Sequence, residues 1–143
     1  MTQKKFQKLQ VFTDGGSRNN PGNAGIGFVL MTPEGVIIDQ MGKYIGIATN
    51  NEAEYQALLT ALQHIKNFHS SCKELTIYSD SELMVKQLLR VYKIKEPHLR
   101  KFAEVIWELL DTIADWQIKH VLRDKNQLAD QLVNEALDKQ LCK

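Results

Sequence analysis

The order in which strand-like and helix-like segments follow one another is the strongest constraint on the fold of this chain. Three strand-like runs come first, and turn residues such as Asn19-Asn20-Pro21-Gly22 separate them. Strand-like runs then alternate with segments whose apolar residues recur at helical spacing. The strands are predicted at residues 9–13, 24–31, 36–44, 74–79 and 116–122, and the helices at 51–68, 81–91, 97–113 and 126–140. This β-β-β-α-β-α-α-β-α order predicts an α/β fold in which helices pack on a five-stranded mixed sheet.

The chain is predicted to form one domain. No repeat or Pro/Gly/Ser-rich linker divides the 143 residues, so we expect a single domain over residues 1–143 with its core at about 9–140. Cys72 and Cys142 have no paired spacing, which favours a reducing, cytoplasmic compartment. No apolar segment suits a signal peptide or a membrane span, and nothing indicates an obligate protein partner, so we expect a monomer.

Basic residues are unevenly distributed, although the formal net charge is only +1. Lys4, Lys5 and Lys8 lie near the start, and a second basic group lies within residues 90–101. A local basic stripe is enough to follow a phosphate backbone, because the attraction is short-ranged and screened by salt. A solvated protein surface has the same composition, so charge alone leaves both interpretations open.

Four acidic residues occupy positions that are typical of a functional site. Asp14 and Asp80 each end a predicted strand, whereas Glu54 lies on the apolar stripe of its helix and Asp130 at the edge of another such stripe. A charge that faces a protein core is costly unless it is paired or holds a metal. Carboxylates without Cys or His partners favour a hard cation such as Mg²⁺ or Mn²⁺.

Each acid also has an ordinary explanation. Asp14 could belong to a turn, and Glu54 could complete a capping box with Asn51. Asp80 could be a helix N-cap, and Asp130 a partly exposed helix residue. Spacing alone therefore leaves the metal site and these explanations both open.

The four acids lie in motifs that resemble those of type 1 ribonuclease H. The motifs are Thr13-Asp14-Gly15-Gly16 followed by Asn20-Pro21-Gly22, Thr49-Asn50-Asn51 followed by Glu54-Tyr55, Ser79-Asp80-Ser81, and His120-Val121 followed by Arg123, Asn126 and Ala129-Asp130. They occur in the order and at the spacing of that family, between about residues 9 and 136. The resemblance implies a ribonuclease H-like fold, which agrees with the predicted order of elements.

The resemblance also implies an activity and its cofactor. Asp14, Glu54, Asp80 and Asp130 would bind two Mg²⁺ ions, for which Mn²⁺ can substitute, and would act as the catalytic residues. A pair of cations activates a water molecule and stabilises the leaving oxygen. The expected reaction is endonucleolytic hydrolysis of the RNA strand of an RNA/DNA hybrid, which leaves 5′-phosphate and 3′-hydroxyl ends.

Further positions are implied to bind substrate. The substrate-binding residues expected from the resemblance are Gly15, Gly16, Asn20, Thr49, Asn50, Asn51 and Arg123. Asn20, Asn50 and Asn51 correspond to positions near the RNA strand, where amides can read 2′-hydroxyls. Thr49 corresponds to a position that holds a DNA-strand phosphate. Helix capping is an alternative for the second and third asparagines, and an ordinary surface role is an alternative for Arg123.

The chain departs from many family members in two places. It lacks their Gly- and His-rich loop before the last acid, and we interpret His120 as a strand residue, with a catalytic role as the lesser alternative. It also lacks their basic, Trp-bearing insertion, since residues 90–101 contain no Trp. The absence of this insertion predicts weaker or differently arranged hybrid binding.

Two other functions are compatible with parts of these motifs. A nuclease of the same superfold that acts on double-stranded RNA or on DNA is the nearest alternative, followed by an inactive hybrid-binding module. The presence of all four acids argues against the inactive module. A calcium loop is excluded because Arg18 replaces an oxygen ligand, and the glycines of residues 22–27 form neither a dinucleotide nor a Walker motif.

Overall fold

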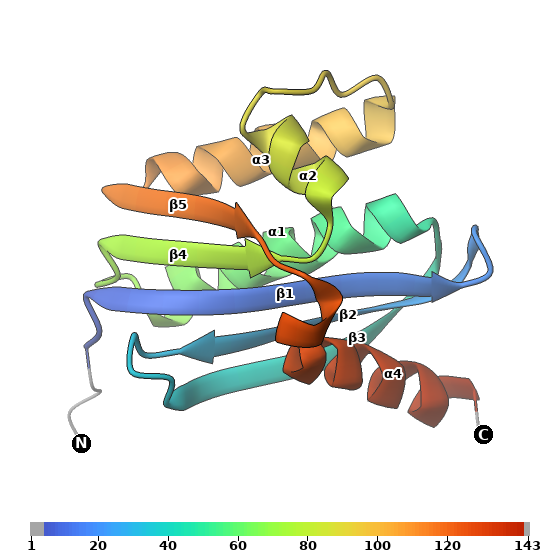
Figure 1. Ribbon diagram of the computed structural model, residues 1–143, viewed down its shortest axis with the longest axis horizontal. Coiled ribbons are helices and arrows are strands. Elements are labelled where there is room, and N and C mark those ends of the chain that lie inside the picture. Colours follow the sequence, from blue (N-terminus) through green and yellow to red (C-terminus); the bar gives the residue numbers. More distant parts are fainter. Residues whose placement is uncertain (1–4, 142–143) are drawn as a thin grey trace.

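Five strands form one mixed sheet, in the order β3-β2-β1-β4-β5 (Figure 1). The computed structural model describes residues 5–141, so Lys4 and Cys142 lie outside the described residues. The strands are β1 (Lys8–Arg18), β2 (Gly22–Met31), β3 (Ile37–Ala48), β4 (Glu74–Ser79) and β5 (Asp115–His120). The first three strands pair antiparallel, and β4 and β5 extend the sheet in parallel to β1. The predicted five-stranded mixed sheet is therefore confirmed.

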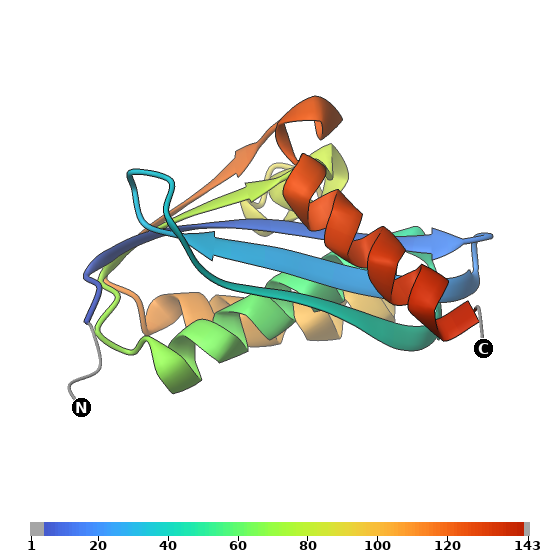
Figure 2. The same ribbon diagram turned by 90° about the horizontal axis from the view of Figure 1, so that it is seen from below.

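Helices cover both faces of the sheet. They are α1 (Asn50–Phe68), α2 (Glu82–Leu88), α3 (Pro97–Asp111) and α4 (Gln127–Leu141), with a short 3₁₀ helix, η1 (Arg123–Lys125), before the last. Figure 2 shows α1 and α3 on one face and α4 on the other. The main core lies between the sheet and the first of these layers, where the predicted α1 stripe from Leu58 to Ile65 is buried.

The first strand is longer than the sequence predicted. It was expected to stop at Asp14, but the strand continues to Arg18 because Asp14-Gly15-Gly16 pairs with residues 25–27 of β2. Gly15 is required here by packing, since a Cβ atom at this position would lie 2.2 Å from the carbonyl oxygen of Ala53 in α1. Gly15 thus allows the first turn of α1 to pack against the strand, and the turn in the chain is confined to residues 19–21.

Helix α4 also lies close to the sheet. Gly27 of β2 faces it, and a Cβ atom there would be 2.7 Å from the carbonyl oxygen of Ala129. At the C-terminal part of α4, Arg18 Nη2 donates to Asp138 Oδ1 at 2.6 Å and joins the helix to the end of β1. This approach carries Asp130, near the start of α4, toward the middle of β1.

Several predicted boundaries were wrong. Strand β3 continues to Ala48, and α2 ends at Leu88, before Arg90 takes a positive φ of 64°. The 3₁₀ helix at Arg123–Lys125 was not predicted. Among residues 5–141, no helix is long and apolar enough to cross a membrane. The single domain over residues 1–143 stays a prediction.

Candidate active site

Three of the four predicted acids meet at one point. Asp14 lies in the middle of β1, Glu54 in the first half of α1, and Asp80 directly after β4. One oxygen from each carboxylate lies within 4.8 Å of the other two. The side chains of Asp14 and Glu54 are buried, at 5% and 8% exposure, so two of these charges have left bulk water.

The crowding of the site raises the pKa values of Asp14 and Glu54. Burial, the charge of Asp80 and interactions with Asp130 raise the pKa of Asp14 from 3.8 to about 8. Burial and the charges of Asp14 and Asp80 likewise raise the pKa of Glu54 well above its ordinary value. The Gly15 N–H donates to Glu54 Oε1 at 3.0 Å and partly opposes this effect. In the described part of the chain, no basic side chain forms an ion pair with these acids.

Asp130 joins the cluster from α4. Its carboxyl group interacts with that of Asp14, and this interaction contributes to the raised pKa of Asp14. Asp14, Glu54, Asp130 and Arg123 all line one open pocket of about 350 Å³. Four carboxylates from four separate elements therefore surround one small region, and a divalent cation is the species that this donor set fits.

The ordinary explanations for two of the acids are wrong. Thr49 caps α1, and its capping box is completed by Glu52, whose backbone N–H donates to Thr49 Oγ1 at 3.1 Å. Glu54 therefore does not serve as the capping-box acid. Ser81 caps α2 by accepting a hydrogen bond from the Met84 N–H at 3.2 Å, so Asp80 is not the N-cap.

Asn126 is a site residue to which the sequence analysis gave no role. It is 1% exposed, and its Nδ2 donates to the Thr13 carbonyl oxygen at 2.8 Å and to Asp80 Oδ2 at 3.3 Å. The side chain thus ties the segment before α4 to β1 and orients Asp80. Its place in the fourth motif, just before a helix, was the available signal, but that position is equally typical of a capping residue.

Two of the three asparagines expected to contact RNA, Asn20 and Asn50, are hydrogen-bonded to each other, and Asn50 lines the pocket. The Ser17 N–H donates to Asn50 Oδ1 at 2.8 Å, and the Asn50 N–H donates to Asn20 Oδ1 at 3.0 Å. Asn51 follows on the exposed first turn of α1. The capping alternative for Asn50 and Asn51 is wrong because Thr49 is the N-cap.

Two further predicted positions, Gly16 and Arg123, also line this pocket, whereas His120 does not. Gly16 lines the same pocket, and a Cβ atom there would meet nothing closer than Asn50 Oδ1 at 3.9 Å. Arg123 is exposed on η1. His120 is exposed at the end of β5, where it pairs in register with Ser79 and lies near Glu82. It is a strand residue, as interpreted from the sequence.

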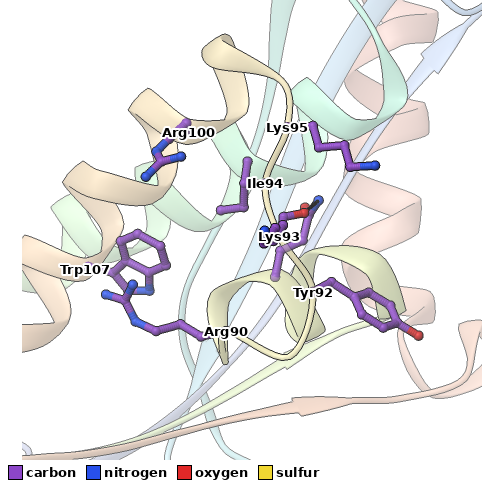
Figure 3. Close-up of a pocket in the computed structure, with 8 residues that line it drawn as sticks. Arg90, Tyr92, Lys93, Ile94, Lys95, Arg100 and Trp107 are labelled. Carbon is purple, nitrogen blue, oxygen red and sulfur yellow. Dashed lines mark hydrogen bonds between the residues drawn. The ribbon is translucent and has the colours of Figure 1, made fainter.

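A second, basic pocket lies between the end of α2 and α3 (Figure 3). Its lining includes the basic residues Arg90, Lys93, Lys95 and Arg100. The Arg90 guanidinium carbon lies 3.8 Å from the centroid of the Trp107 ring, and Trp107 Nε1 donates to the Leu88 carbonyl oxygen. The basic segment has no Trp of its own, but α3 supplies one to it.

Comparisons with known proteins agree with the fold and the motifs. The family model described as Reverse transcriptase-like matches residues 12–136. Ribonuclease HI of Halobacterium salinarum is 42% identical, and the match covers 92% of this chain and 65% of that protein, so this chain spans less than two thirds of that relative. Ribonuclease H of Hydrogenovibrio crunogenus is 30% identical, with 93% of this chain and 97% of that protein covered.

Solved structures match over nearly the whole chain. The crystal structure of RNase H1 from Halobacterium salinarum has a TM-score of 0.88 and covers 92% of this chain and 98% of that one, at 42% identity. LC11-RNase H1, isolated from compost, was solved in complex with an RNA/DNA hybrid. That complex has a TM-score of 0.88 and 41% identity, covering 93% of this chain and 99% of that one.

The sheet order and the acid cluster together define a ribonuclease H-like fold. The chain belongs to the type 1 ribonuclease H family, as its four motifs predicted.

Proposed function

We propose that this protein is an endoribonuclease that hydrolyses the RNA strand of RNA/DNA hybrids. The observation that carries the proposal is the meeting of Asp14, Glu54 and Asp80 within 4.8 Å, with Asp130 lining the same pocket. A buried group of acids without basic partners destabilises the fold unless it binds a cation. The relatives' names and the hybrid bound to LC11-RNase H1 support the choice of substrate.

The four carboxylates would hold two Mg²⁺ ions, with Mn²⁺ as a substitute. All four ligands are carboxylate oxygens, which are the donors that these hard cations prefer. They come from a strand, two helices and the end of a second strand. When bound, such ions supply an activated water and stabilise the leaving 3′ oxygen, which yields 5′-phosphate and 3′-hydroxyl ends. Because water is the nucleophile in this reaction, the protein needs no Ser or Cys nucleophile.

The protein's own contribution is to hold the acids in place. The Gly15 N–H holds Glu54 Oε1, and the Asn126 amide holds Asp80 Oδ2. Asp14 is fixed by its position within β1, where it pairs with Gly27 of β2. Rigid placement matters because a catalytic group displaced by about 1 Å can lose about 100-fold in rate.

The asparagine rim would read the RNA strand. Asn20 and Asn50 are joined by a hydrogen bond, and Asn51 is exposed beside them. Amide groups both donate and accept hydrogen bonds, as a 2′-hydroxyl does, so they can distinguish RNA from DNA. Gly15 and Gly16 would allow the substrate backbone to come close to β1. Thr49 would contact a DNA-strand phosphate, and Arg123 the scissile region.

The basic pocket would contact phosphates farther along the duplex. Its four basic side chains all lie within residues 90–100. The contact with the Trp107 ring holds the Arg90 guanidinium in place. Such contacts add affinity without sequence preference. This surface would take the place of the family insertion that the chain lacks. We further expect a monomer that acts in the cytoplasm.

A cleavage assay tests the proposal. Protein is incubated with an end-labelled RNA/DNA hybrid, single-stranded RNA, double-stranded RNA or duplex DNA, in Mg²⁺, Mn²⁺ or EDTA. We expect internal cuts in the RNA of the hybrid that require metal and disappear in Asp14→Asn. Comparable cutting of double-stranded RNA would broaden the substrate. Binding of hybrid without cutting under either metal would leave an inactive binding module and refute the proposal.

A further inference from the structure

A second group of potential metal ligands lies away from the acid cluster. His64 Nε2 and His69 Nε2 both point at one atom, Asp39 Oδ2, at 2.9 Å and 2.6 Å. One ligand atom from each of the three side chains lies within 4.8 Å of the other two. Since a helix rises about 1.5 Å per residue, His64 lies roughly 15 Å along α1 from Glu54. The two clusters are therefore separate.

The local fold explains why two imidazoles converge. His64 lies on the last part of α1, and His69 is the residue at which that helix ends, with φ −138° and ψ 46°. The departure from helical geometry turns His69 inward, while the neighbouring Phe68 is 59% exposed. Asp39 comes from β3, across from the helix.

The surroundings of the cluster are mostly aromatic. The His64 ring lies 5.2 Å from that of Phe28 and 4.8 Å from that of Phe68, between ring centroids, and Phe6 lies 6.3 Å from His69. The two histidine side chains are 18% and 11% exposed, whereas that of Asp39 is 36% exposed. In residues 5–141, no Lys or Arg forms an ion pair with Asp39. The open side of the cluster faces solvent at the carboxylate.

We propose that Asp39, His64 and His69 form a binding site for a divalent transition-metal ion, with Zn²⁺ as the expected occupant. Two imidazole nitrogens and one carboxylate oxygen are ligands that Zn²⁺ accepts, whereas Mg²⁺ prefers oxygen alone. Zn²⁺ bonds of about 2.0–2.2 Å place ligand atoms about 3–4 Å apart, so the rings need only small rotations away from Asp39. Water would complete the coordination from the solvent side.

The bound ion would join the end of α1 to β3. Because Glu54 lies on the same helix, a cross-link at the far end would stabilise the element that carries a catalytic carboxylate. This inference goes beyond the proposed nuclease function and does not depend on it. The alternative is a hydrogen-bonded trio in which the two histidines merely hold Asp39.

Metal binding is measured on Asp14→Asn protein, in which the acid cluster is weakened as a competing site. The protein is stripped with EDTA, dialysed, and titrated with Zn²⁺ against a chromophoric chelator in excess Mg²⁺. We expect one tight Zn²⁺ per chain. His64→Gln and His69→Gln should each weaken it by more than about 100-fold, because even outer partners of metal ligands change affinity by 10–100-fold. His98→Gln, at an exposed position on α3, is the matched control and should leave binding unchanged.

A thermal melt separates metal binding from a purely structural role. Zn²⁺ should raise the melting temperature of the Asp14→Asn protein, because a ligand that binds only the folded state stabilises it. The increase should vanish in Asp14→Asn/His64→Gln even if that variant is already less stable in EDTA. Visible absorption of the Co²⁺ form should report nitrogen and oxygen ligation. No tight Zn²⁺ in the first titration, or Zn²⁺ binding indifferent to His64→Gln, would overturn the site.

Discussion

Replacing Asp14 with Asn should abolish cleavage and yet stabilise the metal-free protein. Burial, Asp80 and Asp130 raise the pKa of Asp14 to about 8, so the folded state keeps this carboxyl protonated at neutral pH. The unfolded chain releases the proton near the ordinary value of 3.8. Because the folded state binds the extra proton, the free energy of unfolding falls as pH rises between these two values.

The size of the effect follows from the two pKa values. Each pKa unit corresponds to about 1.4 kcal/mol, and pH 7 lies roughly three units above the unfolded value, so Asp14 lowers the free energy of unfolding by up to about 4 kcal/mol. Asn has nearly the same shape and no charge. We therefore expect Asp14→Asn to gain about 1–4 kcal/mol at pH 7 without metal. The gain should be smallest below pH 4 and should level off above pH 8.

Urea denaturation in EDTA at pH 5 and pH 8 measures this difference. Asp111→Asn, which removes an exposed carboxylate at the end of α3, is the control and should change little. Excess Mg²⁺ should then stabilise the wild type more than Asp14→Asn, because the cation binds the ionised cluster. Two results would show that the Asp14 carboxylate does not destabilise the metal-free protein. One is that Asp14→Asn is no more stable than the wild type at pH 8, and the other is that the difference in free energy of unfolding does not increase from pH 5 to pH 8.

Three further substitutions test the positioning of the site and its substrate contacts. Asn126→Ala should lower kcat by about 10–100-fold with unchanged hybrid affinity, because Asp80 loses its partner; an equal loss of binding in a gel-shift assay would contradict this. Arg90→Ala should weaken hybrid binding and reduce the slope of log affinity against log salt by about 1, unlike exposed Lys66→Ala on α1; equal slopes would remove the basic pocket from the interface. Gly27→Ala should displace α4, cost about 1–3 kcal/mol in urea denaturation and reduce cleavage; an unchanged protein would show that α4 adapts freely.

The element order and the acids could be predicted because both are encoded locally. Hydrophobic patterning identified the five strands and the four α-helices, and Glu54 was recognised as inward-facing from its place on the α1 stripe. The end of β1 could not be predicted in the same way. Asp14-Gly15-Gly16 has turn propensity, and pairing with β2 overrides it once the chain is folded. The capping residue could not be assigned for a similar reason, since adjacent polar residues compete for the N-cap and only geometry selects Thr49.

Contacts between distant elements left no pattern in the sequence. Arg90 and Trp107 meet only because α2 ends early and α3 packs beside it. The same holds for Asp39 and His64, which lie on different elements and have no motif spacing. Local periodicity reports which face of an element is buried, but it does not report which elements lie next to one another.

The fourth acid depends on such distant contacts more than the others do. Asp130 enters through α4, which lies close to the sheet because Gly27 leaves room for its backbone. Near its C-terminus the helix is joined to β1 by the Arg18–Asp138 pair, whose side chains are 40% and 63% exposed. An exposed pair contributes little, on the order of 0–1 kcal/mol, so close packing must supply most of the attachment. The position of Asp130 therefore depends mainly on the packing of α4 against the sheet.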